Sequence, residues 1–160
     1  AENLNQAIET VEKYRKRKNT SLYVFSTNIE SELLLTAVDK GEIKVRRINP
    51  VRSLINRVLY EKGEIFFKNA TEAEDGVKDI SAVVVGMGRH GTEMVKALTW
   101  FCQMDGYRVE INGFDKDEKA KERFRAIAPD LLDEKYNKKL VEGESAYSID
   151  IHSQWNIQYP

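Results

Sequence analysis

Three glycines with the spacing of a phosphate-binding loop follow an apolar run. The segment VVVGMGRHG, residues 83–91, places Gly86, Gly88 and Gly91 between that run and an apolar-periodic stretch. In this pattern the first glycine permits a tight turn, the second lets the backbone approach a pyrophosphate, and the third allows close packing of helix and strand. The free N–H groups at the helix start would face the anion. We therefore expect a loop between a strand and a helix that binds a phosphate-containing ligand.

An acidic residue follows at the position where a ribose would lie. Asp115 ends the next strand-like segment, 24 residues after Gly91. A carboxylate there accepts hydrogen bonds from ribose hydroxyls and disfavours a 2′-phosphate. The expected ligand is therefore NAD(H) or an adenine nucleotide (ATP, ADP or AMP) rather than NADP, although the neighbouring Lys116 weakens this inference. In the alternative interpretation the glycines only form a strand–helix turn and Asp115 only caps a helix.

Basic side chains near these motifs allow two interpretations. Arg89, inside the glycine loop, either contacts a phosphate or lies on the surface, whereas His90 is expected to face solvent. Arg46 and Arg47 lie on an expected edge strand. They could bind an anion, but a charged edge that resists the addition of another strand is the simpler explanation.

Side chains that would carry out chemistry are scarce. The chain has two histidines and one cysteine, none of them at the spacing of metal ligands. Cys102 lies in an apolar segment and is expected in the core, and no P-loop or nucleophile elbow appears. A dehydrogenase also needs an acid or base beside the nicotinamide, usually from a second domain. We therefore expect a protein that binds a nucleotide without turning it over.

The elements that would position these residues alternate between strands and helices. Strands are expected at 21–26, 43–48, 80–86, 107–114 and 147–151, with helices between most of them. This alternation predicts an α/β fold with a parallel sheet, a Rossmann-like three-layer arrangement. In the segment 107–114, Tyr107, Val109 and Ile111 are expected to point inward, and Arg108 outward.

Two of the expected strands are apolar throughout, which predicts central strands that are buried on both faces. They are SLYVF and ISAVVV, and we expect them side by side in one sheet. The expected order across that sheet is 147–151, 107–114, 80–86, 21–26 and 43–48. Ser26 and Thr27 would then lie opposite the glycine loop, at the point where the strand order reverses, and would join the site.

Length, composition and charge bound the remaining possibilities. The chain has 160 residues, of which 41% are hydrophobic and 32% charged, and a formal net charge of −1. This balance is typical of a globular domain and offers no overall attraction to nucleic acid. A cytoplasmic location is expected, because no signal-peptide pattern or long apolar run appears. We expect an N-terminal half at 1–62, a joint at 63–79 and a glycine-loop half at 80–160.

The two motifs together resemble a known family. VVVGMGRHGTEMVKAL and VEINGFDKD resemble the nucleotide-binding half of regulator-of-potassium-conductance (RCK) domains, also called the Trk N-terminal NAD-binding family. The matching positions are Gly86, Gly88, Arg89 and Gly91, then Asp115 and Asp117. The resemblance covers roughly residues 80–128, with YSIDIHS in the place of the third strand. It implies that the glycines and Arg89 contact phosphates, that Asp115 binds ribose, and that the protein regulates a membrane transporter or channel.

A second resemblance covers residues 21–60, which are similar to the second half of the same domain. Here that half precedes the first, so the domain is either permuted or the chain joins the end of one domain to the start of the next. The expected function is a non-catalytic, NAD- or adenine-nucleotide-binding regulatory module, linked to potassium transport or similar ligand sensing, in a homo-oligomer. The alternative is the cofactor-binding domain of an NAD-dependent oxidoreductase whose substrate domain lies elsewhere.

Overall fold

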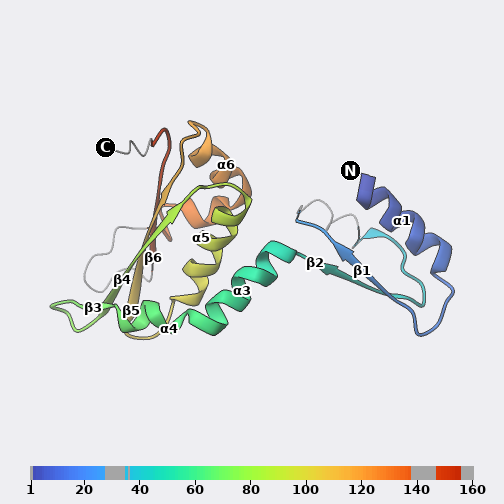
Figure 1. Ribbon diagram of the computed structural model, residues 1–160, viewed down its shortest axis with the longest axis horizontal. Helices are drawn as coiled ribbons and strands as arrows, with labels where there is room; N and C mark the ends of the chain where they lie inside the picture. The colour runs from blue at the N-terminus through green and yellow to red at the C-terminus, as the bar shows by residue number, and fades with distance from the viewer. Residues whose placement is uncertain (1, 28–34, 36, 138–146, 156–160) are drawn as a thin grey trace. The chain divides into compact units, whose positions relative to one another are not determined.

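The chain divides into two compact units. A computed structural model describes residues 2–27, 35, 37–137 and 147–155 (Figure 1). The first unit comprises Ala1–Ser53 and the second Leu54–Pro160. The division falls inside helix α3, Pro50–Lys62. Asn49 caps the start of this helix, because its Oδ1 accepts the backbone N–H groups of Val51 and Arg52, each at 3.1 Å.

The first unit is a helix packed on a small parallel sheet. Helix α1, Glu2–Tyr14, precedes strands β1, Ser21–Phe25, and β2, Lys44–Ile48. The two strands pair in parallel, with Ser21 beside Lys44 and Phe25 beside Ile48. One hydrophobic cluster of this unit contains Ala7, Val24 and Leu35, with Leu4, Leu22 and Val45 packed against them. The helix expected after β1 lies mostly outside the described residues.

The second unit contains the glycine loop. Its elements after α3 are α4, Glu64–Lys68; β3, Thr71–Glu72; β4, Lys78–Val85; α5, Arg89–Phe101; β5, Tyr107–Phe114; α6, Ala120–Ile127; the 3-10 helix η1, Pro129–Leu132; and β6, Tyr147–His152. The sheet order is β3-β4-β5-β6. Strands β4, β5 and β6 run parallel, while the short β3 pairs antiparallel with the start of β4.

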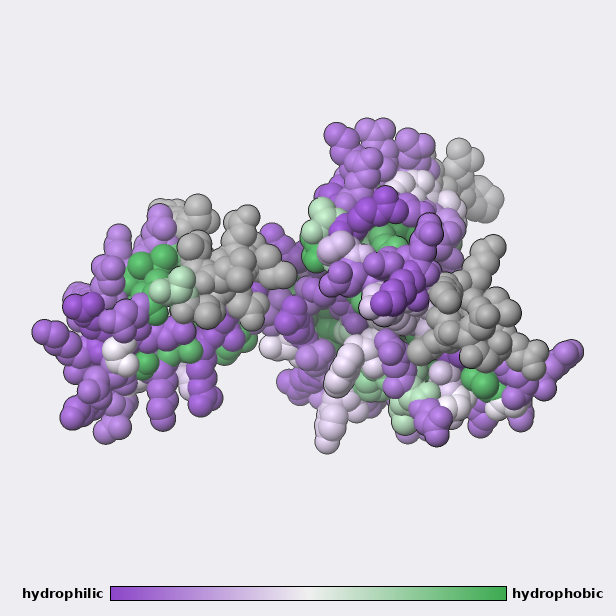
Figure 2. Space-filling model, turned by 180° about the vertical axis from the view of Figure 1, so that it is seen from behind, coloured by the Kyte–Doolittle hydropathy of each residue, from purple (hydrophilic) through white to green (hydrophobic). Residues whose placement is uncertain are grey.

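Helices α5 and α6 cover one face of this second sheet (Figure 1). Alternate residues of the three parallel strands are buried on that face: Ile80, Ala82, Val84, Val109, Ile111, Tyr147, Ile149 and Ile151. The opposite face carries Val83, which is 66% exposed, and Val85, which is 62% exposed. Figure 2 shows that the face seen there is mostly hydrophilic, with hydrophobic residues gathered in a few patches.

The α/β class with parallel strands is confirmed, and it is consistent with a Rossmann-like fold. The predicted single sheet is wrong, because β1 and β2 form one sheet while β3 to β6 form another. The prediction that the two apolar strands are buried on both faces is wrong as well. In β1, Tyr23 is 52% exposed and Phe25 63%. Apolar composition shows that a strand would gain from cover on both faces, but it does not supply the covering element.

Arg108 is the other clear difference from expectation. Instead of pointing into solvent it is buried, because two carboxylates from the β3–β4 region pair with it. Its Nε donates to Asp79 at 2.8 Å and its Nη1 to Asp75 at 2.8 Å. The hydrogen bond to Asp79 and the nearby negative charges raise the pKa of Arg108, so its charge is secure. A residue predicted from alternation to face water therefore anchors the start of β4 to β5.

The segment 63–79, expected as a joint, forms α4, β3 and the first residues of β4. It packs within the second unit through Phe67, whose ring centroid lies 5.6 Å from that of Phe101 and 5.1 Å from that of Tyr107. Cys102 is fully buried, as expected for a core residue. Burial raises the pKa of its thiol from 9.0 to about 11.

Candidate functional site

The glycine loop connects the end of β4 to the start of α5. Gly86 has a φ of +89°, in the region that L side chains rarely adopt, so glycine suits this turn. Its N–H donates to the carbonyl of Phe114 at 2.7 Å, which continues the β4–β5 ladder into the loop. Gly88 occupies the N-cap position of α5, and its carbonyl accepts the N–H of Thr92 at 2.9 Å.

Gly88 and Gly91 have opposite surroundings. A Cβ atom on Gly91 would lie 1.9 Å from the carbonyl oxygen of Gly86, so only glycine lets the helix approach the loop this closely. A Cβ atom on Gly88 would meet no atom within 4 Å. The backbone at Gly88 is therefore open to a ligand, whereas Gly91 serves packing. The close packing at Gly91 is the role that the spacing indicated, whereas a part for Gly88 in binding a pyrophosphate stays a prediction.

Asp115 lies beside the glycine loop and also forms hydrogen bonds that order it. Its Oδ2 accepts the N–H of Met87 at 2.6 Å, and its Oδ1 accepts the N–H of Asp117 at 2.8 Å. Met87 is 2% exposed and packs beneath the loop, where a Cβ on Gly113 would come within 2.7 Å of its sulfur. A carboxylate has about four lone-pair sites, so each oxygen of Asp115 retains the capacity to accept a ribose hydroxyl.

The other predicted site residues lie at the start of α5 and in the first unit. Arg89 and His90 are exposed at the start of α5, where a side chain can reach an anion or solvent. Ser26 and Thr27 belong to the first unit, and the N–H of Ser26 donates to the carbonyl of Ile48 at 3.0 Å. These two residues were placed opposite the glycine loop on the expectation that β1 and β4 are neighbours in one sheet, whereas the two strands belong to different sheets. Their part in a site stays a prediction.

Three aromatic side chains beside Asp115 were not expected from the sequence. The rings of Phe114 and His152 stack with centroids 4.5 Å apart, and the centroid of Trp155 lies 4.7 Å from that of Phe114. The backbone N–H of Trp155 donates to the backbone carbonyl of Asp115 at 2.9 Å, and this bond holds the aromatic group beside Asp115. Such ring faces can stack on a nucleobase. The available signal was the position of Phe114 directly before Asp115.

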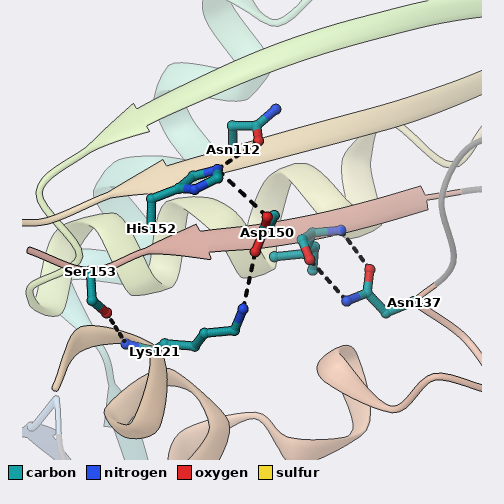
Figure 3. A network of polar contacts seen from close by, with 7 residues as sticks. Asn112, Lys121, Asn137, Asp150, His152 and Ser153 are labelled. Carbon is teal, nitrogen blue, oxygen red and sulfur yellow. Dashed lines mark hydrogen bonds and ion pairs between the residues drawn. The ribbon is translucent and has the colours of Figure 1, made fainter. Parts of the chain in front are cut away.

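A polar network joins β5, β6 and α6 next to this aromatic group (Figure 3). His152 Nε2 lies 3.1 Å from Asn112 Oδ1 and 3.7 Å from Asp150 Oδ2. Lys121 on α6 contacts Asp150 at 3.1 Å. Burial acts to raise the pKa of Asp150, but the hydrogen bond and charge of Lys121, together with His152, lower it overall. The network thus fastens α6 to the strand whose end carries His152.

Asp117, the second acid of the motif, lies at the start of the turn that leads into α6. It accepts the N–H of Lys119 at 2.9 Å and pairs with Arg123. These two hydrogen bonds lower its pKa. Asp117 therefore orders the turn after Asp115, and its carboxylate is ionised at neutral pH.

Comparison of the chain with family models, with curated proteins and with solved structures finds no match. Within the described ranges, no three His, Cys, Asp or Glu side chains are grouped so that they could hold a metal ion. The helices that the structure describes include none long and apolar enough to cross a membrane. The case for function therefore depends on the geometry of the loop and its surroundings.

Proposed function

We propose that this chain is a non-catalytic regulatory module that binds NAD(H) or an adenine nucleotide at residues 86–91. The observation that carries the proposal is the open space above Gly88. It lies at the N-cap of a 13-residue helix, with Asp115 hydrogen-bonded to the same loop. Strand, glycine turn, helix start and acid thus occur together, as in dinucleotide-binding folds.

The phosphates would bind at the start of α5. The first N–H groups of a helix have no partner within the helix, and the helix dipole favours an anion there. Gly88 lets a pyrophosphate approach the backbone, because no side chain fills the space above it. Arg89, exposed at the first helical position, could add a charge-assisted contact.

The nucleoside would extend from the loop towards the end of β5. Asp115 can accept hydrogen bonds from ribose hydroxyls through its remaining lone pairs. The aromatic group at Phe114 and Trp155, which lies next to this carboxylate, offers ring faces to the base. A 2′-phosphate would meet the negative charge of Asp115, which favours NAD over NADP.

Binding of this kind requires few groups, whereas hydride transfer requires more. Backbone donors and one carboxylate suffice for a diphosphate and a ribose, but a reaction needs a substrate held roughly 3 Å from the cofactor and a group that moves its proton. We propose that the ligand instead shifts the population of conformations that a partner recognises. By the resemblance to RCK domains, that partner would be a membrane transporter or channel.

Isothermal titration calorimetry of the full chain with NAD, NADH, NADP, ATP, ADP and AMP tests the proposal. We expect at least one adenine nucleotide to bind the wild type, with NAD bound more tightly than NADP. Gly88→Val should remove binding without unfolding the protein, because the new side chain occupies the space for the pyrophosphate. His90→Val is the matched control, since it changes an exposed residue of the same loop.

Binding that Gly88→Val leaves unchanged would remove the loop from the site. Turnover is measured separately, by the absorbance of the reduced cofactor in the presence of alcohols, hydroxy acids and carbonyl compounds. Protein-dependent turnover that Gly88→Val removes would replace the regulatory proposal with an oxidoreductase.

A further inference from the structure

Strand β1 has one neighbour among the described residues, β2, and so presents an open edge. The carbonyl of Thr20 accepts the N–H of Lys44 at 2.9 Å, and the N–H of Ser26 donates to Ile48 at 3.0 Å. Even-numbered residues of β1 therefore turn their N–H and C=O groups towards β2. Because these directions alternate along a strand, Ser21, Tyr23 and Phe25 turn theirs towards the open edge.

Strand β4 has an open edge of the same kind. Lys78 and Gly86 donate their N–H groups to Gly106 and Phe114, at 2.9 and 2.7 Å, so even-numbered residues face β5. The backbone groups of Ser81, Val83 and Val85 consequently face the other side. There β3 pairs only with Lys78 and Asp79, and no described strand continues beyond them.

The outer edge of β6 differs, because a side chain forms hydrogen bonds with its backbone groups. The side-chain amide of Asn137 donates to the carbonyl of Ile149 at 2.9 Å, and its Oδ1 accepts the N–H of Ile149. One side chain thereby satisfies the N–H and the C=O of Ile149, which both point away from β5. In the described part of the chain no side chain makes such a contact with the backbone of residues 80–85, so the β4 edge remains available to another strand.

The faces beside both open edges are apolar and exposed. In β1 these residues are Tyr23 and Phe25, exposed by 52% and 63%; in β4 they are Val83 and Val85, exposed by 66% and 62%. Parallel strands normally have both faces covered, and a two-stranded sheet alone is marginally stable. Among the described residues, each unit thus shows one sheet edge without a further strand and one apolar face that is exposed.

The two units also carry opposite net charge. The first contains ten Lys and Arg residues against seven Asp and Glu, and the second fifteen against nineteen. A first unit is therefore attracted to a second unit, whereas two units of the same kind repel each other.

We propose that β1 of one copy of this chain adds in parallel to the open edge of β4 in a second copy, and that the exchange is reciprocal. The composite sheet would have the order β2-β1-β4-β5-β6. A second copy is the proposed occupant because each chain offers both edges, one in each of two sheets, and because its two units carry opposite net charge. Two such contacts related by a two-fold axis form a closed dimer.

The direction of the backbone groups determines how the faces meet. In a parallel pair, a residue that bonds across the edge lies beside a residue whose own groups point away. Tyr23 would therefore lie beside Ala82 or Val84, which places its side chain on the face that α5 covers. By the same rule Val83 and Val85 lie beside β1 residues on the face of Val24, which packs against Ala7 of α1. The helices of each unit would thus cover the bare face of the other.

The oligomeric state of the full chain is the first test. Sedimentation equilibrium across a range of concentrations should give a dimer, twice the chain mass of 18.4 kDa, which dissociates on dilution. A monomer at every concentration would overturn the proposal, including the case in which the two strands pair within one chain.

Amide hydrogen exchange, followed by NMR on the wild type, identifies the surface that is buried. The amides of Tyr23, Phe25, Val83 and Val85 should exchange rapidly when dilute and at least about tenfold more slowly in the dimer. The amide of Val84 faces β5 and serves as the internal control, protected in both states. A dimer in which the four edge amides remain fast would associate through another surface, and the proposal would be wrong.

Proline substitutions give an independent test. Val83→Pro and Tyr23→Pro each remove an N–H that faces an open edge, without removing a bond to β5 or β2. Each variant alone should dimerise at least about tenfold more weakly, while Val83→Thr and Tyr23→Thr, which keep the N–H, should resemble the wild type. Mixing the two proline variants should restore a one-to-one complex, because one intact pairing remains.

If either proline variant fails to fold by circular dichroism, the exchange measurement on the wild type still decides the question. Gly88→Val provides a further control, because loss of nucleotide binding should leave dimer formation unchanged. The dimer proposal and the nucleotide proposal can therefore fail separately.

Discussion

Asp115 at the end of β5 accepts the N–H of Met87 in the glycine loop at 2.6 Å, across 28 positions of sequence. The carboxylate that the motif assigns to a ribose therefore also fixes the backbone of the phosphate loop. One residue links the two parts of the candidate site, so a substitution that removes both carboxylate oxygens should change loop order and ligand choice together.

Substitutions of Asp115 separate these two roles. Asp115→Asn keeps an acceptor for Met87 but loses the charge and the second acceptor oxygen, which receives the N–H of Asp117. It should fold with slightly lower stability than the wild type and bind NAD more weakly by about 1–3 kcal/mol. NADP affinity should fall much less, because a 2′-phosphate does not gain from that carboxylate. Calorimetry with both cofactors measures the ratio. Equal losses for NAD and NADP would show that Asp115 only orders the loop.

Asp115→Ala removes the acceptor for Met87 as well as the charge. We expect both a lower melting temperature and weaker binding than in Asp115→Asn, because a partly buried N–H loses its partner. Thermal unfolding followed by circular dichroism measures the first effect. Identical stability of the Ala and Asn variants would contradict a structural role for this hydrogen bond.

Gly91→Ala should destabilise the second unit by about 2–3 kcal/mol, because the new Cβ would overlap the carbonyl oxygen of Gly86 and force α5 away from the loop. Gly88→Ala is the matched control. Its φ of −72° suits any residue and the space above it is empty, so a change within about 0.5 kcal/mol is expected. Urea denaturation compares them, and equal stability of the two variants would show that the helix is not held closely against the turn.

Arg108→Met should lower the melting temperature by about 10 °C, because it leaves the carboxylate of Asp75 buried without its partner. Asp79→Asn should lower the melting temperature by less, since the side chain of Asp79 is 35% exposed and can be hydrated. Differential scanning calorimetry provides the comparison. A larger effect of Asp79→Asn would mean that Asp75 is not the dominant partner.

Cys102 should react very slowly with Ellman's reagent at pH 8 while the protein is folded, and rapidly in urea. Burial excludes the reagent and raises the pKa of the thiol from 9.0 to about 11, so almost no thiolate forms. The folded state disfavours the thiolate, so burial of the protonated thiol contributes to the free energy of unfolding. This contribution is complete below about pH 9 and is lost as the pH rises towards 11, because the unfolded chain then gains by ionising. Rapid labelling of the native protein would show that this core opens readily.

The sequence by itself determined the features that depend on neighbouring residues. Alternation of apolar segments predicted parallel strands joined by helices. An Asn followed by a Pro is typical of a helix start, and α3 begins at Pro50, directly after Asn49. The glycine spacing predicted the turn at Gly86 and the close packing at Gly91, because tight turns and close approaches exclude a Cβ within a few residues of chain.

Tertiary structure decided what depends on distant partners. Apolar composition alone made β1 and β4 look like neighbours in one sheet, whereas pairing placed them in two. Alternation along its strand predicted that Arg108 points into solvent. Instead it is buried and paired with two carboxylates some thirty positions earlier in the chain. The link from Asp115 to Met87 and the aromatic group around Phe114 also join segments far apart in the chain. A residue's pattern shows what surroundings would stabilise it, but only the folded chain determines which groups provide them.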